Sequence, residues 1–184
     1  MADRRSLDAS DQHTRERFQV ASARLDRPEW AIPYRVVVLG ASAKDVVQAA
    51  GGLIFDRIRS GWEAVAMLPD SSDERPLRIL GAKAIRADGE DAQQVMTEVP
   101  HALVVSADLL CENTSIGQWI HNSLNPSLTA LSVWDLSTVR QPNVAALTKH
   151  RLSSAARIFK TAALRAASVP VERCAHTEIF RNGR

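Results

Sequence analysis

The chain is poor in aromatic residues and in cysteine. Aromatics make up 5% of its 184 residues, so a broad surface for stacking nucleic-acid bases is not expected. Its two cysteines, Cys111 and Cys174, are too few for a disulfide framework, and we expect free thiols. No apolar run approaches the ~18 residues of a membrane-spanning helix, and the start lacks the apolar core of a secretion signal. These absences predict a cytoplasmic protein with no membrane partner.

Charge is distributed unevenly along the chain. Residues 136–184 carry nine basic and two acidic side chains, whereas residues 36–135 carry seven basic and thirteen acidic ones. The formal net charge of +2 therefore conceals a basic C-terminal quarter. Such a segment favours an acidic partner, but it could equally pack against the protein's own acidic middle.

Length and composition predict one compact domain. With 45% apolar residues, a chain of this size can bury a real core. Residues 1–33 are polar, end in a proline-containing linker and are expected to form an N-terminal arm. Residues 34–170 are expected to form the α/β domain, and residues 171–184 a short tail that could include an edge strand.

Alternating strand-like and helix-like segments indicate the fold class. The expected strands are apolar segments over residues 35–40, 63–70, 77–82, 101–110 and 128–136. Helical periodicity falls between them and again at the C-terminal end. This alternation predicts a three-layer, Rossmann-like α/β domain without a dinucleotide fingerprint. Its five-strand sheet should be mostly parallel, with a mixed sheet as an alternative.

The alternation alone does not fix whether two of the predicted strands are parallel or antiparallel. The strand at 35–40 is a continuous apolar run, which is typical of a central strand buried on both faces. Only six residues separate the segments at 63–70 and 77–82, and a parallel crossover generally needs about a dozen or more. We therefore expect these two strands to form an antiparallel hairpin, or else to lie in different parts of the sheet.

The turn from Gly40 to Lys44 joins a strand to a helix, as in many phosphate-binding sites. Asp45, however, stands where both the P-loop and the dinucleotide fingerprint require glycine. Ser42 and Asp45 instead have the spacing of a helix N-cap and its third residue. A helix cap is thus the favoured interpretation, and phosphate binding by Gly40, Ser42 and Lys44 the minority one.

Two glycines interrupt the helix that follows this turn. Gly51 and Gly52 each cost about 1 kcal/mol relative to alanine in a helix. We expect them to allow close approach of this helix to the sheet, with a break in the helix as the alternative.

Three aspartates at the ends of predicted strands form a second candidate site. Asp70, Asp108 and Asp135 could hold Mg²⁺ and support phosphoryl chemistry if their strands run in one direction. The predicted hairpin argues against that condition, and aspartate is also common in turns. No zinc-ligand spacing and no serine-hydrolase motif occurs in the sequence, so no cofactor is expected.

A long helix over residues 142–168 is the third candidate. Lys149, Arg157 and Lys160 would share one side of it, and no acidic residue lies between Ser137 and Val171. Such a face could neutralise phosphates or bind an acidic protein, or it could simply be solvated. The apolar face of this helix is expected to comprise Val144, Leu147, Leu152, Ala155, Ile158, Phe159, Ala162 and Ala166.

The sequence favours a non-enzymatic binding or regulatory module whose basic C-terminal helix contacts nucleic acid or an acidic protein partner. The charge distribution and the absence of every catalytic pattern tested support this hypothesis. One alternative is a nucleotide or phosphate sensor, or a small Mg²⁺-dependent enzyme, that uses the Gly40–Lys44 turn and the strand-end aspartates. Another is a scaffold or oligomer subunit.

Overall fold

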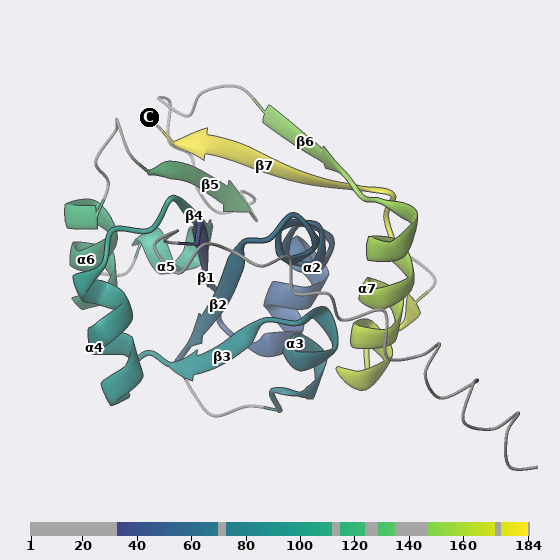
Figure 1. Ribbon diagram of the computed structural model, residues 1–184, viewed down its shortest axis with the longest axis horizontal. Coiled ribbons are helices and arrows are strands. Elements are labelled where there is room, and N and C mark those ends of the chain that lie inside the picture. The colour runs from purple at the N-terminus through teal and green to yellow at the C-terminus, as the bar shows by residue number, and fades with distance from the viewer. Residues whose placement is uncertain are drawn as a thin grey trace, which may run out of the picture. The chain divides into compact units, whose positions relative to one another are not determined.

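The computed structural model describes residues 33–69, 73–111, 115–123, 129–134, 147–171 and 174–183 (Figure 1). Residues 33–184 form one compact unit. The predicted arm at residues 1–33 lies outside the described residues except for Pro33. Among the helices described, none is long and apolar enough to cross a membrane.

The described residues form a seven-stranded mixed sheet in the order β3-β2-β1-β4-β5-β7-β6. The first five strands of that order are parallel, and β7 runs antiparallel to both β5 and β6. The strands are β1 (Arg35–Leu39), β2 (Glu63–Leu68), β3 (Lys83–Arg86), β4 (Ala102–Ser106), β5 (Ala130–Trp134), β6 (Leu147–Arg151) and β7 (Thr177–Gly183). The predicted α/β class is confirmed, whereas the predicted count of five strands is wrong.

Helices cover the two faces of the sheet and form two cores. They are α2 (Ala43–Arg59), α3 (Arg75–Leu80), α4 (Glu90–Thr97), α5 (Ala107–Cys111), α6 (Ser115–Ser123) and α7 (Ser154–Ala166). In β1, Val36 and Val38 face the core shared with α2, α3 and α7, while Val37 and Leu39 face the core shared with α4, α5 and α6. The prediction of a central strand buried on both faces is therefore confirmed.

The predicted strand at residues 77–82, and the hairpin inferred from it, are wrong. Residues 75–80 form helix α3, and Gly81 ends it in the left-handed conformation, with φ of 88°. Leu77 and Leu80, three positions apart, are both buried, so one face of a single helical turn accounts for the apolar pattern. The chain then enters β3, which pairs parallel to β2.

The predicted helix over residues 142–168 is also wrong in its first part. Residues 142–146 lie outside the described residues, and residues 147–151 form strand β6. Helix α7 begins only after Ser153, whose hydroxyl accepts a hydrogen bond from the Ala156 N–H at 3.0 Å. Strand β7 in the C-terminal tail lies between β5 and β6 rather than at the sheet edge.

Helix α7 buries a different face from the one that its apolar residues predict. Ala156, Lys160 and Ala163 face the core, together with Leu164. Ile158 and Phe159, assigned to the core by periodicity, are 68% and 43% exposed. A lysine thus occupies the inner face while large apolar side chains occupy the outer one.

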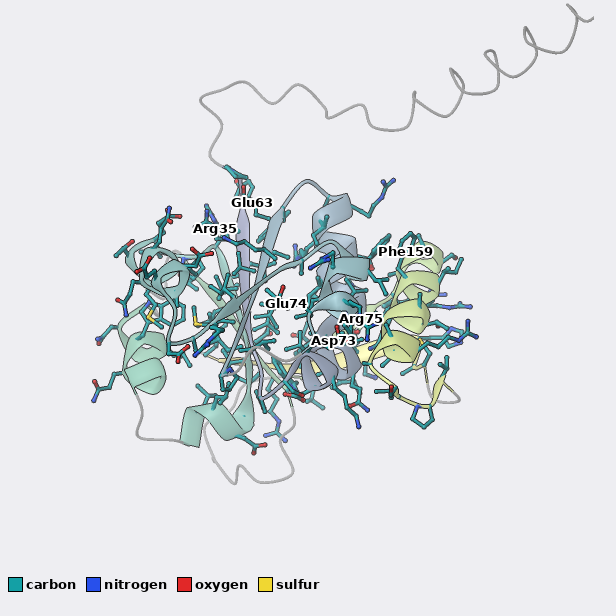
Figure 2. The ribbon with its side chains drawn as sticks, turned by 90° about the horizontal axis from the view of Figure 1, so that it is seen from below. Arg35, Glu63, Asp73, Glu74, Arg75 and Phe159 are labelled. Carbon is teal, nitrogen blue, oxygen red and sulfur yellow. The ribbon has the colours of Figure 1, made fainter. Side chains whose placement is uncertain are left out.

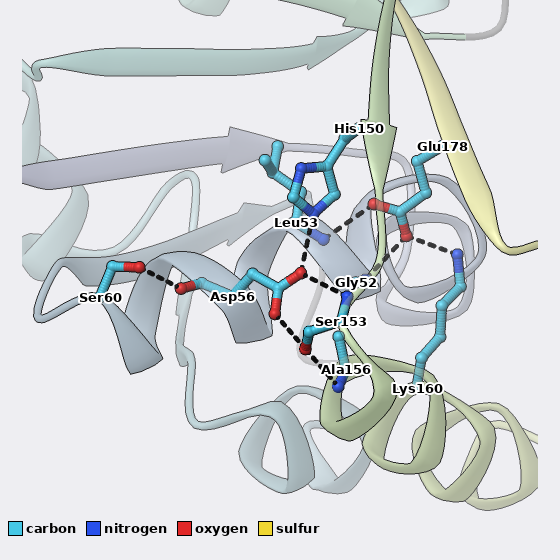
Figure 3. A network of polar contacts seen from close by, with 9 residues as sticks. All are labelled: Gly52, Leu53, Asp56, Ser60, His150, Ser153, Ala156, Lys160 and Glu178. Atoms are coloured by element: carbon cyan, nitrogen blue, oxygen red, sulfur yellow. Dashed lines mark hydrogen bonds and ion pairs between the residues drawn. The ribbon is translucent and has the colours of Figure 1, made fainter.

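A buried ion pair explains this orientation (Figure 3). The Lys160 ammonium lies 2.6 Å from the Glu178 carboxylate, and the two side chains are 3% and 2% exposed. The Glu178 oxygens also accept hydrogen bonds from the backbone N–H groups of Gly52 (2.7 Å) and Leu53 (2.8 Å). Lys160 donates to the Gln48 carbonyl at 2.7 Å. In a regular helix the Gly52 N–H would donate to the Gln48 carbonyl. Glu178 therefore contacts the donor of this helical position and Lys160 contacts its acceptor.

Gly52 allows the close approach that this arrangement requires. A Cβ atom at Gly52 would lie 2.3 Å from Cγ of Leu152, the residue that follows β6. At Gly51 it would lie 3.3 Å from the nearest atom, at the tip of Leu80. The prediction of a close approach to the sheet therefore needs correction, because α2 approaches the segment between β6 and α7.

We expect Gly52→Ala to destabilise the protein by about 1–3 kcal/mol, because overpacking against Leu152 outweighs the gain in helix propensity. Gly51→Ala is the matched control and should change the free energy of unfolding little. Urea unfolding of both variants measures the difference. Equal free energies of unfolding for the two variants would show that a side chain at position 52 does not clash with Leu152.

We expect Lys160→Met to destabilise the protein by about 3–5 kcal/mol, because it leaves the Glu178 carboxylate buried without its cation. Adding Glu178→Leu should restore part of that loss, since Gly52 N–H can then bond within the helix. Lys83→Met, which removes an exposed pair with Asp91, should cost less than about 1 kcal/mol. Denaturant unfolding of Lys160→Met, Glu178→Leu and the double variant tests this prediction. If the loss of unfolding free energy in the double variant equals the sum of the two single losses, the two side chains are not coupled.

Candidate functional site

Four parallel strands bring their carboxyl ends to one edge of the sheet. Strands β1, β2, β4 and β5 run in the same direction, and ligands of open α/β sheets bind at that edge. The strands that precede Asp70, Asp108 and Asp135 therefore run in one direction, as a shared magnesium site requires. The expected hairpin had argued against this common direction. Asp108 is exposed on α5, while Asp70 and Asp135 lie outside the described residues. Their convergence stays a prediction.

The turn after β1 forms the helix cap that its sequence predicts. Ser42 is the N-cap of α2, and its hydroxyl accepts a hydrogen bond from the Asp45 N–H at 3.2 Å. One Asp45 carboxylate oxygen accepts from the Ala41 N–H at 3.1 Å, and the other accepts from the Trp134 indole N–H at 3.3 Å. Asp45 thus ties the turn to the end of β5 and places a carboxylate beside the start of α2.

A cavity of about 270 Å³ lies beside this turn. Its polar lining includes Ser42, Lys44, Asp73, Arg75 and Ser168. Arg75 hydrogen-bonds to Asp73 at 2.6–2.9 Å (Figure 2), and these bonds hold the pKa of Asp73 below its usual value. The cavity is therefore lined by an ionised Asp73–Arg75 pair and by the exposed cation of Lys44.

A second cavity, of about 420 Å³, lies near the amino ends of β1, β2 and β3. Its charged residues are paired with one another: Arg35 binds Glu63 and Glu98, and Lys83 binds Asp91. Although this cavity is larger, it lies away from the edge at which open α/β sheets hold ligands. The smaller cavity beside Ser42 is the better candidate.

A serine, a histidine and an aspartate meet elsewhere in the fold, at the start of α7 (Figure 3). The Ser153 hydroxyl lies 2.6 Å from one Asp56 oxygen, and His150 Nε2 lies 3.0 Å from the other. In a nucleophilic triad the histidine must contact the serine, but here both contact the aspartate. These residues fasten α7 and β6 to α2. No local motif identifies the cluster, because Asp56 is remote in sequence from the other two residues.

The structure does not bring the predicted basic residues onto one helix face. Lys149 is exposed on β6, and Arg157 is exposed on α7, 3.2 Å from His176 Nδ1. Lys160 is buried in its pair with Glu178. The physical reason is that residues 147–151 are extended, so helical spacing does not apply between Lys149 and the other two.

Within the described ranges, no three or more histidine, cysteine, aspartate or glutamate side chains form a group that could hold a metal ion. The described residues at the carboxyl edge therefore do not fit a site with three such ligands.

No protein-family model and no curated protein sequence matches the chain. Its fold is similar to that of a deacetylase of teicoplanin biosynthesis, solved with teicoplanin, at a TM-score of 0.56 and 11% identity over 80% of this chain and 97% of that one. It is also similar to N,N'-diacetylchitobiose deacetylase from Pyrococcus horikoshii (TM-score 0.51, 12% identity, 100% and 95% covered). A third similar structure is GalB, the 4-carboxy-2-hydroxymuconate hydratase from Pseudomonas putida. Its TM-score is 0.53 and its identity 11%, over 82% of this chain and 96% of that one.

These similar structures belong to enzymes, and at 10–12% identity they establish the likeness of the fold. The prediction of a non-enzymatic module that binds nucleic acid or an acidic protein is contradicted by this comparison. That prediction rested on the basic C-terminal quarter and on the absence of every catalytic pattern tested. One of its three named residues, Lys160, is buried.

We expect Ser42→Ala to lower the free energy of unfolding by about 1 kcal/mol, because the first turn of α2 loses its cap. Ser42→Asn should retain nearly all of the stability, since asparagine caps equally well. Thermal unfolding of the two variants measures the difference. Identical losses in both would contradict a purely capping role.

Proposed function

We propose that the chain is a cytoplasmic enzyme that removes an acyl group from the nitrogen of a small, sugar-containing substrate at the carboxyl edge of its sheet. The observation that carries this proposal is the shared fold. Two similar structures are named as deacetylases of teicoplanin and of N,N'-diacetylchitobiose, and the matches cover 80% or more of this chain. The cavity beside Ser42 lies near the carboxyl end of β1, and open α/β sheets bind ligands at the carboxyl ends of their strands.

Deacylation breaks the amide C–N bond. The oxygen of a water molecule bonds to the acyl carbon, and the released amine takes up a proton. The reaction needs a base for the water and a positive partial charge near the acyl oxygen. The Lys44 ammonium supplies positive charge at the cavity. Both Asp45 oxygens accept hydrogen bonds, so we assign Asp45 to holding the turn in place.

We propose the strand-end aspartates as candidates for the base; the structure describes Asp108, which lies on α5 just after β4 and not in the lining of the cavity beside Ser42. Asp70 and Asp135 follow strands that run in the same direction as β4. Ser42 and Lys44, first considered together with Gly40 for phosphate, line the cavity and would meet the polar part of the substrate. In this proposal no step passes through a metal ion.

The test is release of free amine from N,N'-diacetylchitobiose and other N-acylated amino sugars, measured with an amine-reactive fluorophore, with and without a chelator. We expect activity in the wild type and a loss of about tenfold or more in kcat/KM for Lys44→Met or Asp108→Asn. Lys83→Met is the matched control and should retain full activity, because Lys83 lies at the amino end of β3, away from the carboxyl ends of the strands. A folded wild type that releases no amine from any of these substrates would refute the proposal.

A further inference from the structure

Ser168 adopts an unfavourable backbone conformation just after α7. Its φ of 55° is left-handed, and within the described ranges every other residue with a positive φ is a glycine. Those glycines, Gly61 and Gly81, lie at the ends of α2 and α3. Three helices therefore end in a left-handed residue, and serine replaces glycine at one of them. Because a Cβ atom makes this conformation costly, serine is the less stable choice for the fold at position 168.

Capping of the helix does not explain the serine. The backbone N–H groups of Ser168 and Val169 donate to the carbonyls of Arg165 and Leu164 at 3.0 and 2.9 Å, which completes the helix end without a side chain. Within the described part of the chain, the Ser168 hydroxyl has no hydrogen-bond partner. Residues in sparsely populated backbone conformations cluster at ligand and active sites. Ser168 lines the cavity beside Ser42, so its hydroxyl is available to a ligand there.

Asp73 and Arg75, which line the same cavity, form a neutral pair that keeps both a donor and an acceptor unused (Figure 2). Three N–H groups of Arg75 donate to the Asp73 carboxylate, which can accept about four hydrogen bonds. The Nη1 group of Arg75 makes none of these bonds. Since the two charges cancel and both a donor and an acceptor remain, the pair suits a neutral hydroxyl group, which donates and accepts at once.

The size and the remaining lining of the cavity suit one sugar ring. Its volume of about 270 Å³ lies just below the roughly 300–1,000 Å³ of pockets for drug-sized ligands. Small apolar side chains complete the described lining, namely Ala43, Pro76, Ala166 and Ala167. A sugar ring presents hydroxyl groups at its edge and C–H groups on its faces, so it can contact both the polar and the apolar part of this lining.

We propose that Asp73, Arg75 and Ser168 form a subsite that binds the hydroxyl groups of one sugar ring of the substrate. One sugar hydroxyl donates to Asp73 and accepts from Arg75, and another bonds to the Ser168 hydroxyl. Lys44, in the same cavity, is then left for the acyl group. This inference rests on the proposed function for the acylated sugar as substrate, but binding of the sugar ring can be measured without turnover.

Two substitutions at position 168 separate the hydroxyl from the backbone strain. Ser168→Gly removes both, whereas Ser168→Ala removes the hydroxyl and keeps a Cβ atom in the left-handed conformation. The probe is glucose, which carries ring hydroxyls but no acyl group, titrated into the ¹⁵N-labelled full chain and followed by NMR. We expect both variants to bind glucose about fivefold more weakly than the wild type, because one hydrogen bond is lost. Only Ser168→Gly should raise the midpoint of thermal unfolding, by about 2–4 °C.

Gly61→Ser is the matched control, because it places a serine in the same backbone conformation outside the lining of the cavity. It should lower the midpoint of thermal unfolding and leave glucose binding unchanged. A wild type that does not bind glucose, or Ser168 variants that bind it as tightly as the wild type, would overturn the subsite even if amine is released from N-acylated sugars. Glucose binding that depends on Ser168, without release of amine, would support the subsite and refute the proposed function instead.

Discussion

The pair of Lys160 and Glu178 is the interaction on which the arrangement of this fold depends. Burying two charges costs several kcal/mol per ion, and only good geometry and further hydrogen bonds offset that cost. Here two backbone N–H groups and one carbonyl of α2 supply them. One interaction therefore joins α2, α7 and β7, which are far apart in sequence. Because the N-terminus of α2 begins beside the candidate site, the pair also fixes the helix that carries Ser42 and Lys44.

The same constraint accounts for two features that are unfavourable when taken alone. Gly52 weakens a helix, yet its missing side chain lets α2 lie against Leu152 and leaves its N–H beside Glu178. Ile158 and Phe159 remain exposed because the inner face of α7 is committed to Lys160. A local cost in helix propensity and an exposed apolar face are thus both consequences of placing an ion pair in the core.

Local patterns predicted the parts of the fold that local forces decide. The continuous valine run of β1 and the spacing of Ser42 and Asp45 led to the central strand and the helix cap. The short apolar segment at residues 77–82 was misassigned because one helical turn and a short strand have the same composition. The orientation of α7 could not be predicted, since it depends on Glu178 in a remote strand. For the site, the sequence singled out the turn at Ser42, but the common direction of the strands, and with it the likeness to enzymes, emerged only from the tertiary structure.

The most direct test of this account is an NMR measurement of the lysine side-chain ammonium groups in uniformly ¹⁵N-labelled protein. The chain has four lysines, and Lys160 is the one that the structure buries in an ion pair. Exposed ammonium protons exchange rapidly with water, whereas those of Lys160 should exchange slowly and give a signal that Lys160→Met removes. A spectrum in which no lysine ammonium is protected from exchange would contradict the buried pair and the arrangement of helices that follows from it.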